Sequence, residues 1–390
     1  MPYTVTLLFG KDPVSKVDPR ETVDHYRSSI ANQVTVGQSL ARLQLLTNAD
    51  PAPQSSNELS IQDKSEIISS TVELSEDDGQ IVVVSKENGF PALENNKIVV
   101  NQNLVIDGDI NFHTGNIDCP GDLLIKGSIM SGFKVKAEKL TVTGNIENAE
   151  IQSSDDLVCA GGIVACQDHP LLCGANLWCK YLENSHITVK NNIFIAGSSL
   201  HSFLKAGNNI VLCNSSAVLV GGKSEAGNSL YSGSLGAKWA TPTEIILGCE
   251  PFMAENLVDQ SHKLKKIETE LNELKERVDQ INIFLQHEEG QTTRHDAHRL
   301  QEERELLENK LSFVSEKHKT ALSKFNDLEN QITNFKKANN DCILNVSKQL
   351  FSGIRLTIKD AATRTEEDNL SSTIIMREQD GEIVTRKTTI

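Results

Sequence analysis

Five side chains that could bind a metal lie close together in the middle of the sequence. They fall within 21 residues: Cys159, Cys166, His169, Cys173 and Cys179. Cysteine and histidine at this density are typical of zinc sites, but no two of these cysteines have the CxxC spacing of a zinc knuckle. Cys159 and Cys179 also fall on an alternating apolar pattern, where a thiol behaves as a small apolar side chain. We therefore predict core cysteines and no metal site, with Cys166, His169 and Cys173 as a surface alternative.

Histidines form a second candidate site near residue 290. His295 and His298 are three residues apart, and His287 precedes them. Their imidazoles could meet at a metal if the chain folded back here, but the HExxH pattern of metalloproteases is absent from the sequence. We predict a solvated tip at this point of the chain, without a metal.

Lysines supply the last candidates for chemistry. Lys126, Lys134, Lys136 and Lys139 cluster in the sequence, and β-helical polysaccharide lyases use acidic and basic side chains along one exposed face. These lysines alternate with apolar residues, as on a solvated face. The six-residue aliphatic period of β-helical acyltransferases is also absent. We predict no catalytic residues and no cofactor, and keep a polysaccharide-active enzyme as an alternative.

An aliphatic repeat must position these residues. LVIDGDI begins at Leu104, LLIKGSI at Leu123, LTVTGNI at Leu140 and LVCAGGI at Leu157. Looser copies follow, with starts 15 to 20 residues apart, at Leu177, Ile193, Ile210, Leu230 and Ile245. A unit of this length is too short for a helix pair and predicts one coil of a parallel β-helix. The low aromatic content of 5% fits a thin interior of small aliphatic side chains.

Two columns of the repeat should face the interior, because side chains two apart point to the same side of a strand. The first column holds the starting residues, and the second holds Ile106, Ile125, Val142, Cys159, Cys179, Ile195, Leu212, Ser232 and Leu247. Polar pairs such as Asn191-Asn192 precede the starts, and we expect them to form corners with a left-handed backbone. The glycines that follow the second column, Gly108, Gly127, Gly144 and Gly161, predict the next corner.

The apolar pattern changes to heptads after Ile245. One heptad series runs from Leu257 to Leu285 and a second from Ala297 to Phe335, with charged residues elsewhere. The short EEGQTTRH connection predicts an antiparallel coiled-coil hairpin about 60 Å long, with the polar His318 at a seam position. A helix pair inside a globular domain and a hairpin that pairs between two chains are the alternatives.

These patterns divide the chain into four segments. We predict a small mixed α/β module over residues 1–95, the β-helix over 96–250, the antiparallel coiled-coil hairpin over 251–344, and strands over 345–390 that return to the β-helix end. Within the first segment, VGQSLARLQLL predicts a short strand and a helix, and Asp78-Gly79 predicts the turn of a β-hairpin.

Composition excludes several partners. The net charge of −15 and the lack of a basic stripe argue against nucleic acid and anionic membranes. The longest apolar runs fall short of a membrane span, and the start has no basic leader, so we expect a cytoplasmic protein with reduced thiols.

Several motifs together resemble the bacterial flagellar assembly protein A family. They are HTGNI at residues 113–117, GFKVKAEKLTVTGNIENAEI at 132–151, KYLENSHITV at 180–189, VGGKSEAGNSLYSGSLG at 220–236 and SGIRLTI at 352–358. The resemblance covers about residues 75–385. It implies a right-handed β-helix that a long coiled coil interrupts near its end, and a non-enzymatic protein that assembles or places flagella at the cell pole.

The combined prediction is a scaffold of mainly β structure. We expect the exposed β-helix faces and the arm tip to contact flagellar assembly, polar landmark or signalling proteins, and the chain to be able to form a homo-oligomer. At the tip we expect protein contacts by Gly290, Arg294, His295 and His298. A filament built by stacking open β-helix ends is the rival hypothesis.

Overall fold

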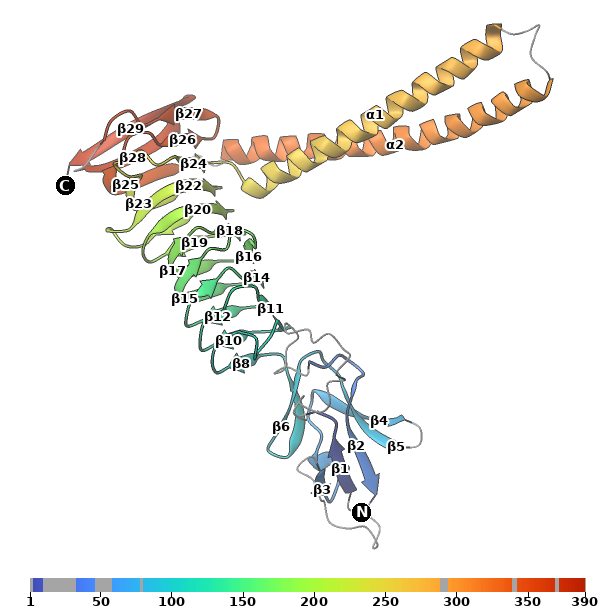
Figure 1. The fold of residues 1–390 in the computed structure, drawn as a ribbon, viewed down its shortest axis with the longest axis vertical. Helices are drawn as coiled ribbons and strands as arrows, with labels where there is room; N and C mark the ends of the chain where they lie inside the picture. Colours follow the sequence, from blue (N-terminus) through green and yellow to red (C-terminus); the bar gives the residue numbers. More distant parts are fainter. Residues whose placement is uncertain are drawn as a thin grey trace.

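The computed structural model describes residues 3–9, 33–45, 58–77, 80–287, 294–338, 342–368 and 372–389. A β-solenoid of about eight turns forms the middle of the molecule. The N-terminal sheet module lies at one end of the solenoid, and a long helical hairpin projects sideways near the other end (Figure 1). The predicted fold class, a mainly β chain with an inserted helical hairpin, is confirmed.

The N-terminal module is an antiparallel sheet in the order β3-β1-β2-β5-β4. Its strands are β1 (Tyr3–Leu7), β2 (Ser39–Leu45), β3 (Glu58–Ile61), β4 (Val72–Asp77) and β5 (Gln80–Ser85), followed by the separate hairpin of β6 (Phe90–Glu94) and β7 (Lys97–Asn101). β4 and β5 form the expected hairpin, although its turn, Asp78-Gly79, lies outside the described residues.

The helix that we expected within residues 36–46 is wrong. This stretch forms β2, and the only helix in the described part of residues 1–95 is a short 3-10 turn, Lys64–Glu66. Ala41 and Leu43 are buried while Arg42 and Gln44 are not, so the burial alternates with the period of a strand. Pairing with β1 and β5 on both sides decides against local helix propensity.

Three parallel faces make up the solenoid. The first face contains β8 (Leu104–Ile106), β10 (Leu123–Ile125), β12 (Leu140–Val142), β15 (Leu157–Val164), β17 (Leu177–Glu183), β19 (Ile193–Ile195), β21 (Ile210–Leu212), β23 (Leu230–Leu235) and β25 (Ile343–Leu350). The second face contains β9 (Ile117–Asp118), β11 (Lys134–Ala137), β14 (Glu150–Ser153), β16 (Leu171–Cys173), β18 (His186–Val189), β20 (Ser199–Ala206), β22 (Val218–Ala226), β24 (Thr243–Leu247) and β26 (Arg355–Ile358). The narrow third face contains β13 (Ile146–Glu147) and the adjoining ends of longer strands.

The predicted inward columns are present on the first face. Leu123 pairs with Leu104 on one side and with Leu140 on the other, and the same parallel register continues rung by rung to Leu230. The last predicted members, Ile245 and Leu247, are wrong. They lie on the second face, and Leu230 pairs instead with Leu344. The helical hairpin separates these two rungs in the sequence, so the period alone could not find the next one.

The corners of the solenoid differ in backbone conformation and in side-chain hydrogen bonds. The polar pairs lie between the second and first faces as predicted, but none of them has a positive φ angle. Their side chains instead form a ladder, in which Asn192 Nδ2 donates to Asn176 Oδ1 over 3.0 Å and Asn209 Nδ2 donates to Asn192 Oδ1 over 3.0 Å. Positive φ angles recur between the third and second faces, at Gly132, Asn148, Ala165, Asn184 and His201.

Glycines form the corner between the first and third faces, as predicted. A Cβ atom on Gly127 would lie 2.4 Å from the carbonyl oxygen of Gly108, and one on Gly161 would lie 2.5 Å from that of Gly144. Neither Gly127 nor Gly161 has a positive φ angle. Close backbone approach, rather than a left-handed conformation, therefore requires glycine there.

Both ends of the solenoid are covered. Phe90 of β6 joins the solenoid core at the N-terminal end. At the other end β27 (Ala361–Arg364) and β28 (Ser372–Gln379) pair antiparallel with β26 and β25, and β29 (Glu382–Thr389) pairs antiparallel with β28. Antiparallel strands of the same chain therefore end the stack of parallel strands.

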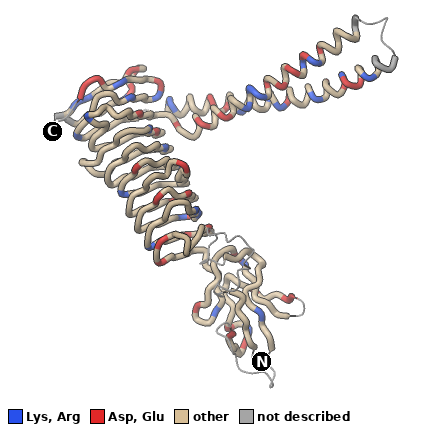
Figure 2. The backbone as a smooth tube through the Cα atoms, viewed as in Figure 1, with Lys and Arg blue, Asp and Glu red and all other residues tan. Residues whose placement is uncertain are grey.

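The helical hairpin consists of α1 (Pro251–His287) and α2 (Arg294–Ala338). Every described member of the two predicted heptad series is buried or half-buried, and Leu264, Leu271, Val278, Ile281 and Val314 are the most enclosed. Charges of both signs line the hairpin (Figure 2). The connection at residues 288–293, including the predicted cap Gly290, lies outside the described residues.

Candidate functional surfaces

The arm, residues 251–338, is the most extended feature of the molecule. Its helices contain 37 and 45 residues, which at 1.5 Å per residue gives lengths of about 56 and 68 Å. The arm replaces one solenoid corner, because it joins β24 of the second face to β25 of the first. Beyond it, the backbone N–H of Ile343 donates to Ser229 Oγ over 3.2 Å, so the side-chain ladder of that corner continues across the insertion.

Polar contacts across the seam fix how the two helices meet. His318 Nε2 lies 3.5 Å from Glu268 Oε1, and Arg277 donates to Glu303 over 3.2 Å. The position of His318 at the seam agrees with the heptad prediction. Both contacts join α1 to α2, so they favour one alignment of the helices over a slipped one.

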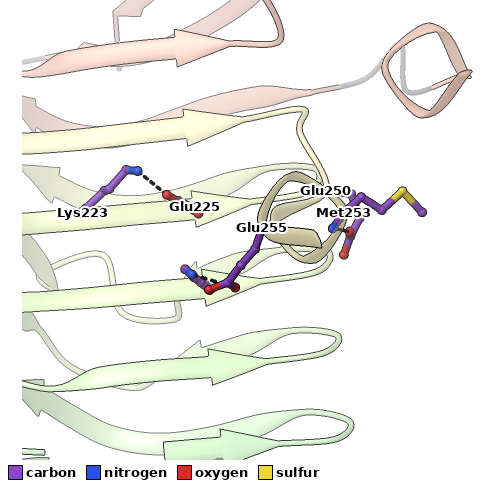
Figure 3. Close-up of polar contacts among 6 residues, drawn as sticks. Lys223, Glu225, Glu250, Met253 and Glu255 are labelled. Carbon is purple, nitrogen blue, oxygen red and sulfur yellow. Dashed lines mark hydrogen bonds and ion pairs between the residues drawn. The ribbon is translucent and has the colours of Figure 1, made fainter. Parts of the chain in front are cut away.

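The root of α1 is capped by its own sequence. The Glu250 carboxylate accepts a hydrogen bond from the backbone N–H of Met253 over 2.5 Å, and Pro251 occupies the first helical position (Figure 3). A side-chain acceptor before the helix satisfies a donor that has no partner within the first turn. Proline is favoured next to it, because its missing N–H would be unsatisfied there anyway. The helix therefore starts directly at the solenoid corner.

Aromatic rings seat both helices on the solenoid. A methyl group built on Gly207 would lie 3.5 Å from the ring of Phe252 in α1, and one on Gly227 would lie 3.5 Å from the ring of Phe335 in α2. Both glycines also approach the previous coil closely, since a Cβ on Gly207 would lie 2.0 Å from the carbonyl oxygen of Lys190. Glycine at these corners thus permits the coil to stack and leaves a flat seat for each ring.

Two ion pairs reinforce the root. Lys205 Nζ lies 3.1 Å from Glu255 Oε2 of α1 (Figure 3), and Lys336 Nζ of α2 lies 2.5 Å from Asp360 Oδ1 beyond β26. One pair therefore holds each helix to the solenoid, on opposite sides of the insertion. A cap, two seated rings and two ion pairs together predict an arm of defined direction.

Three of the four predicted contact residues, Arg294, His295 and His298, lie at the start of α2. Gly290 is outside the described residues, and Arg294 and His295 begin α2, although their side chains are not described. His298 Nδ1 lies 3.3 Å from Glu302 Oε1 one helical turn away. Sequence reasoning missed Ile283, Phe284 and Leu306, which expose apolar side chains on the outer part of the arm. Their positions outside the heptad seam were the available signal.

The four clustered cysteines, Cys159, Cys166, Cys173 and Cys179, belong to the solenoid interior. Cys159 and Cys179 are aligned on neighbouring parallel strands in the inward column, as predicted. The surface alternative for Cys166 and Cys173 is wrong, because both are buried and their thiols contact backbone carbonyl oxygens. Burial raises the pKa of all four thiols, and that of Cys159 to about 11. The described residues contain no group of three or more metal-binding side chains.

The four clustered lysines do not converge on one site. Lys126 follows the first face and pairs with Asp107 over 2.8 Å, whereas Lys134 lies on the second face and pairs with Glu150 over 2.6 Å. Lys136 extends from the second face and Lys139 lies at a corner. The solenoid therefore spreads these cations over different sides.

An uncharged stripe runs along the first face, and sequence reasoning missed it. The residue between the two inward columns points outward in each coil, and the parallel register aligns these residues from rung to rung. We call this set the stripe: Val105, Leu124, Thr141, Val158, Trp178, Phe194, Val211 and Tyr231. The signal was available in the repeat, since no copy from Leu104 to Leu230 carries a charge at this position.

The comparisons with known proteins point to one family. A model of the flagellar assembly protein A β-solenoid domain matches residues 102–383. Neither the curated proteins nor the solved structures gave a match. Neither helix in the described part of the chain has an apolar stretch long enough to cross a bilayer.

Proposed function

Because the chain belongs to the flagellar assembly protein A family, which gives it a role related to the flagellum, we propose that it is a non-enzymatic scaffold for assembling or placing the bacterial flagellum at the cell pole. In this proposal the solenoid and its arm hold other proteins at a fixed separation. The proteins would be flagellar assembly, polar landmark or regulatory signalling proteins of the cytoplasm.

The anchored arm is the observation that carries the proposal. A coiled coil of about 60 Å that is capped, seated and ion-paired at its root can hold a contact surface far from the solenoid. The outer part of this arm exposes Ile283, Phe284 and Leu306. Exposed apolar side chains on a helix pair are a common basis for protein recognition, so they support contact by the outer arm together with Gly290, Arg294, His295 and His298.

The rival filament hypothesis has less support. Stacking of solenoids needs an open end whose strands offer unpaired backbone groups. Here antiparallel strands β27 and β28 cover the C-terminal end. An enzyme is also disfavoured, because the family is one of flagellar assembly proteins and the clustered lysines lie on different sides.

Shortening the arm without changing its tip tests the proposal. Deleting residues 263–276 and 307–320 removes two heptads from each helix and keeps Ile283, Phe284 and Leu306, and the contact Glu268–His318 shows that these segments lie opposite one another. The arm should shorten by about 21 Å while the solenoid stays folded. In cells that carry this variant as their only copy, we expect flagella to be lost or misplaced.

A tip variant is the matched companion. Replacing Arg294, His295 and His298 with alanine keeps the length of the arm and removes its predicted contacts. If reach and tip both matter, each variant should reduce swimming and polar flagellation. Normal flagellation with both variants, at normal protein levels, would remove the scaffold proposal for the arm.

A further inference from the structure

The stripe is a continuous outward ladder in which every rung contacts the next. Leu124 is aligned with Val105 and Thr141, and the register continues without interruption to Tyr231. At its centre the rings of Trp178 and Phe194 stack with centroids 5.4 Å apart and an interplanar angle of 13°. Three members are exposed, Val105, Trp178 and Tyr231, and the other five are half-buried.

The columns on either side widen this surface in the later coils. One flank carries the corner amides Asn176, Asn192 and Asn209, and the other carries Ala160, Ala196 and Cys213, whereas Ser229 and Gly233 of the last rung are buried. Lys180 and Asp156 are the charged residues at these flanking positions from Val158 to Tyr231. The earlier coils differ, because Asp107, Asp122, Lys126 and Lys139 flank the stripe there.

We propose that the stripe is the contact surface between two copies of this chain, which pack face to face through their first faces. The net charge of −15 makes two copies repel each other over most of their surface. The stripe brings no charge into the centre of the contact, and the charged residues of the flanking columns lie at its rim, where charges stay partly hydrated. Two flat sheet faces pack well at about 10 Å separation, and a two-fold contact uses the same patch on both subunits.

The order of side chains supports a second copy as the occupant. From Val158 to Val211 the rungs read valine, tryptophan, phenylalanine, valine. These four central rungs run small, large, large, small in both directions, so a two-fold axis across the solenoid opposes large rungs to large ones there, and an axis along the solenoid opposes each rung to its own copy. A different protein would have to supply a matching uncharged face, whereas a second copy has one already.

The area is sufficient for a specific dimer. Eight rungs spaced about 4.8 Å apart give a length of about 34 Å, and three outward positions per rung give a width of about 20 Å. The product is about 700 Å² per subunit, close to the roughly 800 Å² per partner of a standard-size interface.

Sedimentation equilibrium tests the proposal directly. The chain of 42.9 kDa should behave as a dimer at micromolar concentration, and the double variant Trp178→Glu plus Phe194→Glu should behave as a monomer of 42.9 kDa. The matched control is Leu172→Glu plus Phe203→Glu on the second face. Leu172 and Phe203 are 43% and 46% exposed, compared with 36% for Trp178, so both double variants place new carboxylates on an outer face of the solenoid. The control variant should remain dimeric.

Two further measurements make the outcome decisive. Circular dichroism should show both variants folded, and the variant with the shortened arm should still dimerise, which excludes pairing through the arm. A wild-type monomer at about 100 µM would overturn the proposal, even if a different protein covered the stripe in cells. A Trp178→Glu plus Phe194→Glu variant that stays dimeric would also overturn it. Either result leaves the flagellar role untouched, because none of these measurements depends on flagella.

Discussion

The first and second faces of the solenoid share one interior but differ in their outer chemistry. The stripe on the first face carries no charge over eight rungs. On the second face the aligned outer residues are charged at most rungs, as in Lys223, Glu244 and Arg355. The inward columns are aliphatic on both faces. Coiling therefore determines the interior, and the outer positions are free to differ according to what each face contacts.

The two faces therefore differ in how they interact with water. Charges on the second face form cross-rung pairs such as Lys134–Glu150 and Arg355–Glu244, which keep that face hydrated. The uncharged first face gains nothing from water. A protein that needs one interacting face and one free face can obtain both from a single repeat.

Thiol labelling tests which side chains point into the solenoid. We expect the difference in labelling rate between inward and outward thiols to be the largest effect of these experiments. Cys159 points inward and Cys213 is exposed. Burial raises the pKa of Cys159 to about 11, so at pH 8 only about one thiol in a thousand would be ionised even if a reagent reached it. A maleimide should label Cys213 rapidly in the folded, monomeric Trp178→Glu plus Phe194→Glu variant, in which the proposed dimer contact does not cover it.

Cys159, Cys166, Cys173 and Cys179 should react only after unfolding, as mass spectrometry of labelled peptides would reveal. Rapid native labelling of Cys159 would contradict the inward column. Stoichiometric zinc in the purified protein, measured by plasma mass spectrometry, would contradict the assignment of these thiols to the core.

Alanine substitution on neighbouring residues compares the two sides of one strand. Leu140 is fully buried between Leu123 and Leu157, and Leu140→Ala should lower the free energy of unfolding by about 3 kcal/mol. Thr141 lies next to it on the stripe, and Thr141→Ala should change this free energy by less than about 0.5 kcal/mol. Urea unfolding followed by circular dichroism would measure both. Equal losses would mean that the strand does not separate an inside from an outside.

The corner ladder should give a smaller effect. Asn192 Nδ2 donates to Asn176, and Asn192 Oδ1 accepts from both the backbone N–H and the Nδ2 of Asn209. Asn192→Ala therefore removes three side-chain hydrogen bonds and should cost about 1 to 2 kcal/mol. Its neighbour Asn191 has no side-chain hydrogen bond among the contacts found in the described residues, so Asn191→Ala is the control. Comparable losses from the two variants, in the same unfolding assay, would remove the ladder as a stabilising element.

The sequence predicted the parts of the fold that repeat locally. The inward columns, the corner glycines and the heptad seam follow from side-chain periods of a few residues, so they could be found without a structure. The pairing of Leu230 with Leu344 could not, because the arm separates the two strands by more than a hundred residues. The backbone geometry of the corners was also out of reach, since Asn192 suits a left-handed turn and an amide ladder equally well.

The candidate surfaces divide in the same way. The arm and its seam were predicted, whereas the seats of Phe252 and Phe335 on Gly207 and Gly227 depend on which corner lies under which helix. The stripe was visible in the repeat but carried no motif. The stripe can be recognised as one surface only when the register shows that Val158, Trp178 and Phe194 lie side by side.

The smallest effect is expected from the charges of the second face. Lys134 pairs with Glu150, and both side chains are well exposed, so Lys134→Ala should lower the free energy of unfolding by at most about 0.5 kcal/mol. The hydrogen bond from Lys134 lowers the pKa of Glu150 below the ordinary value of a glutamate carboxyl. A lowered folded-state pKa stabilises the protein above the unfolded value and ceases to do so as the pH falls through the folded one. The difference between wild type and Lys134→Ala should therefore be present at pH 7, shrink below about pH 4.5, and also shrink in 1 M salt. A loss above 1 kcal/mol that salt does not reduce would mean that this face is a structural element and not a hydrated surface.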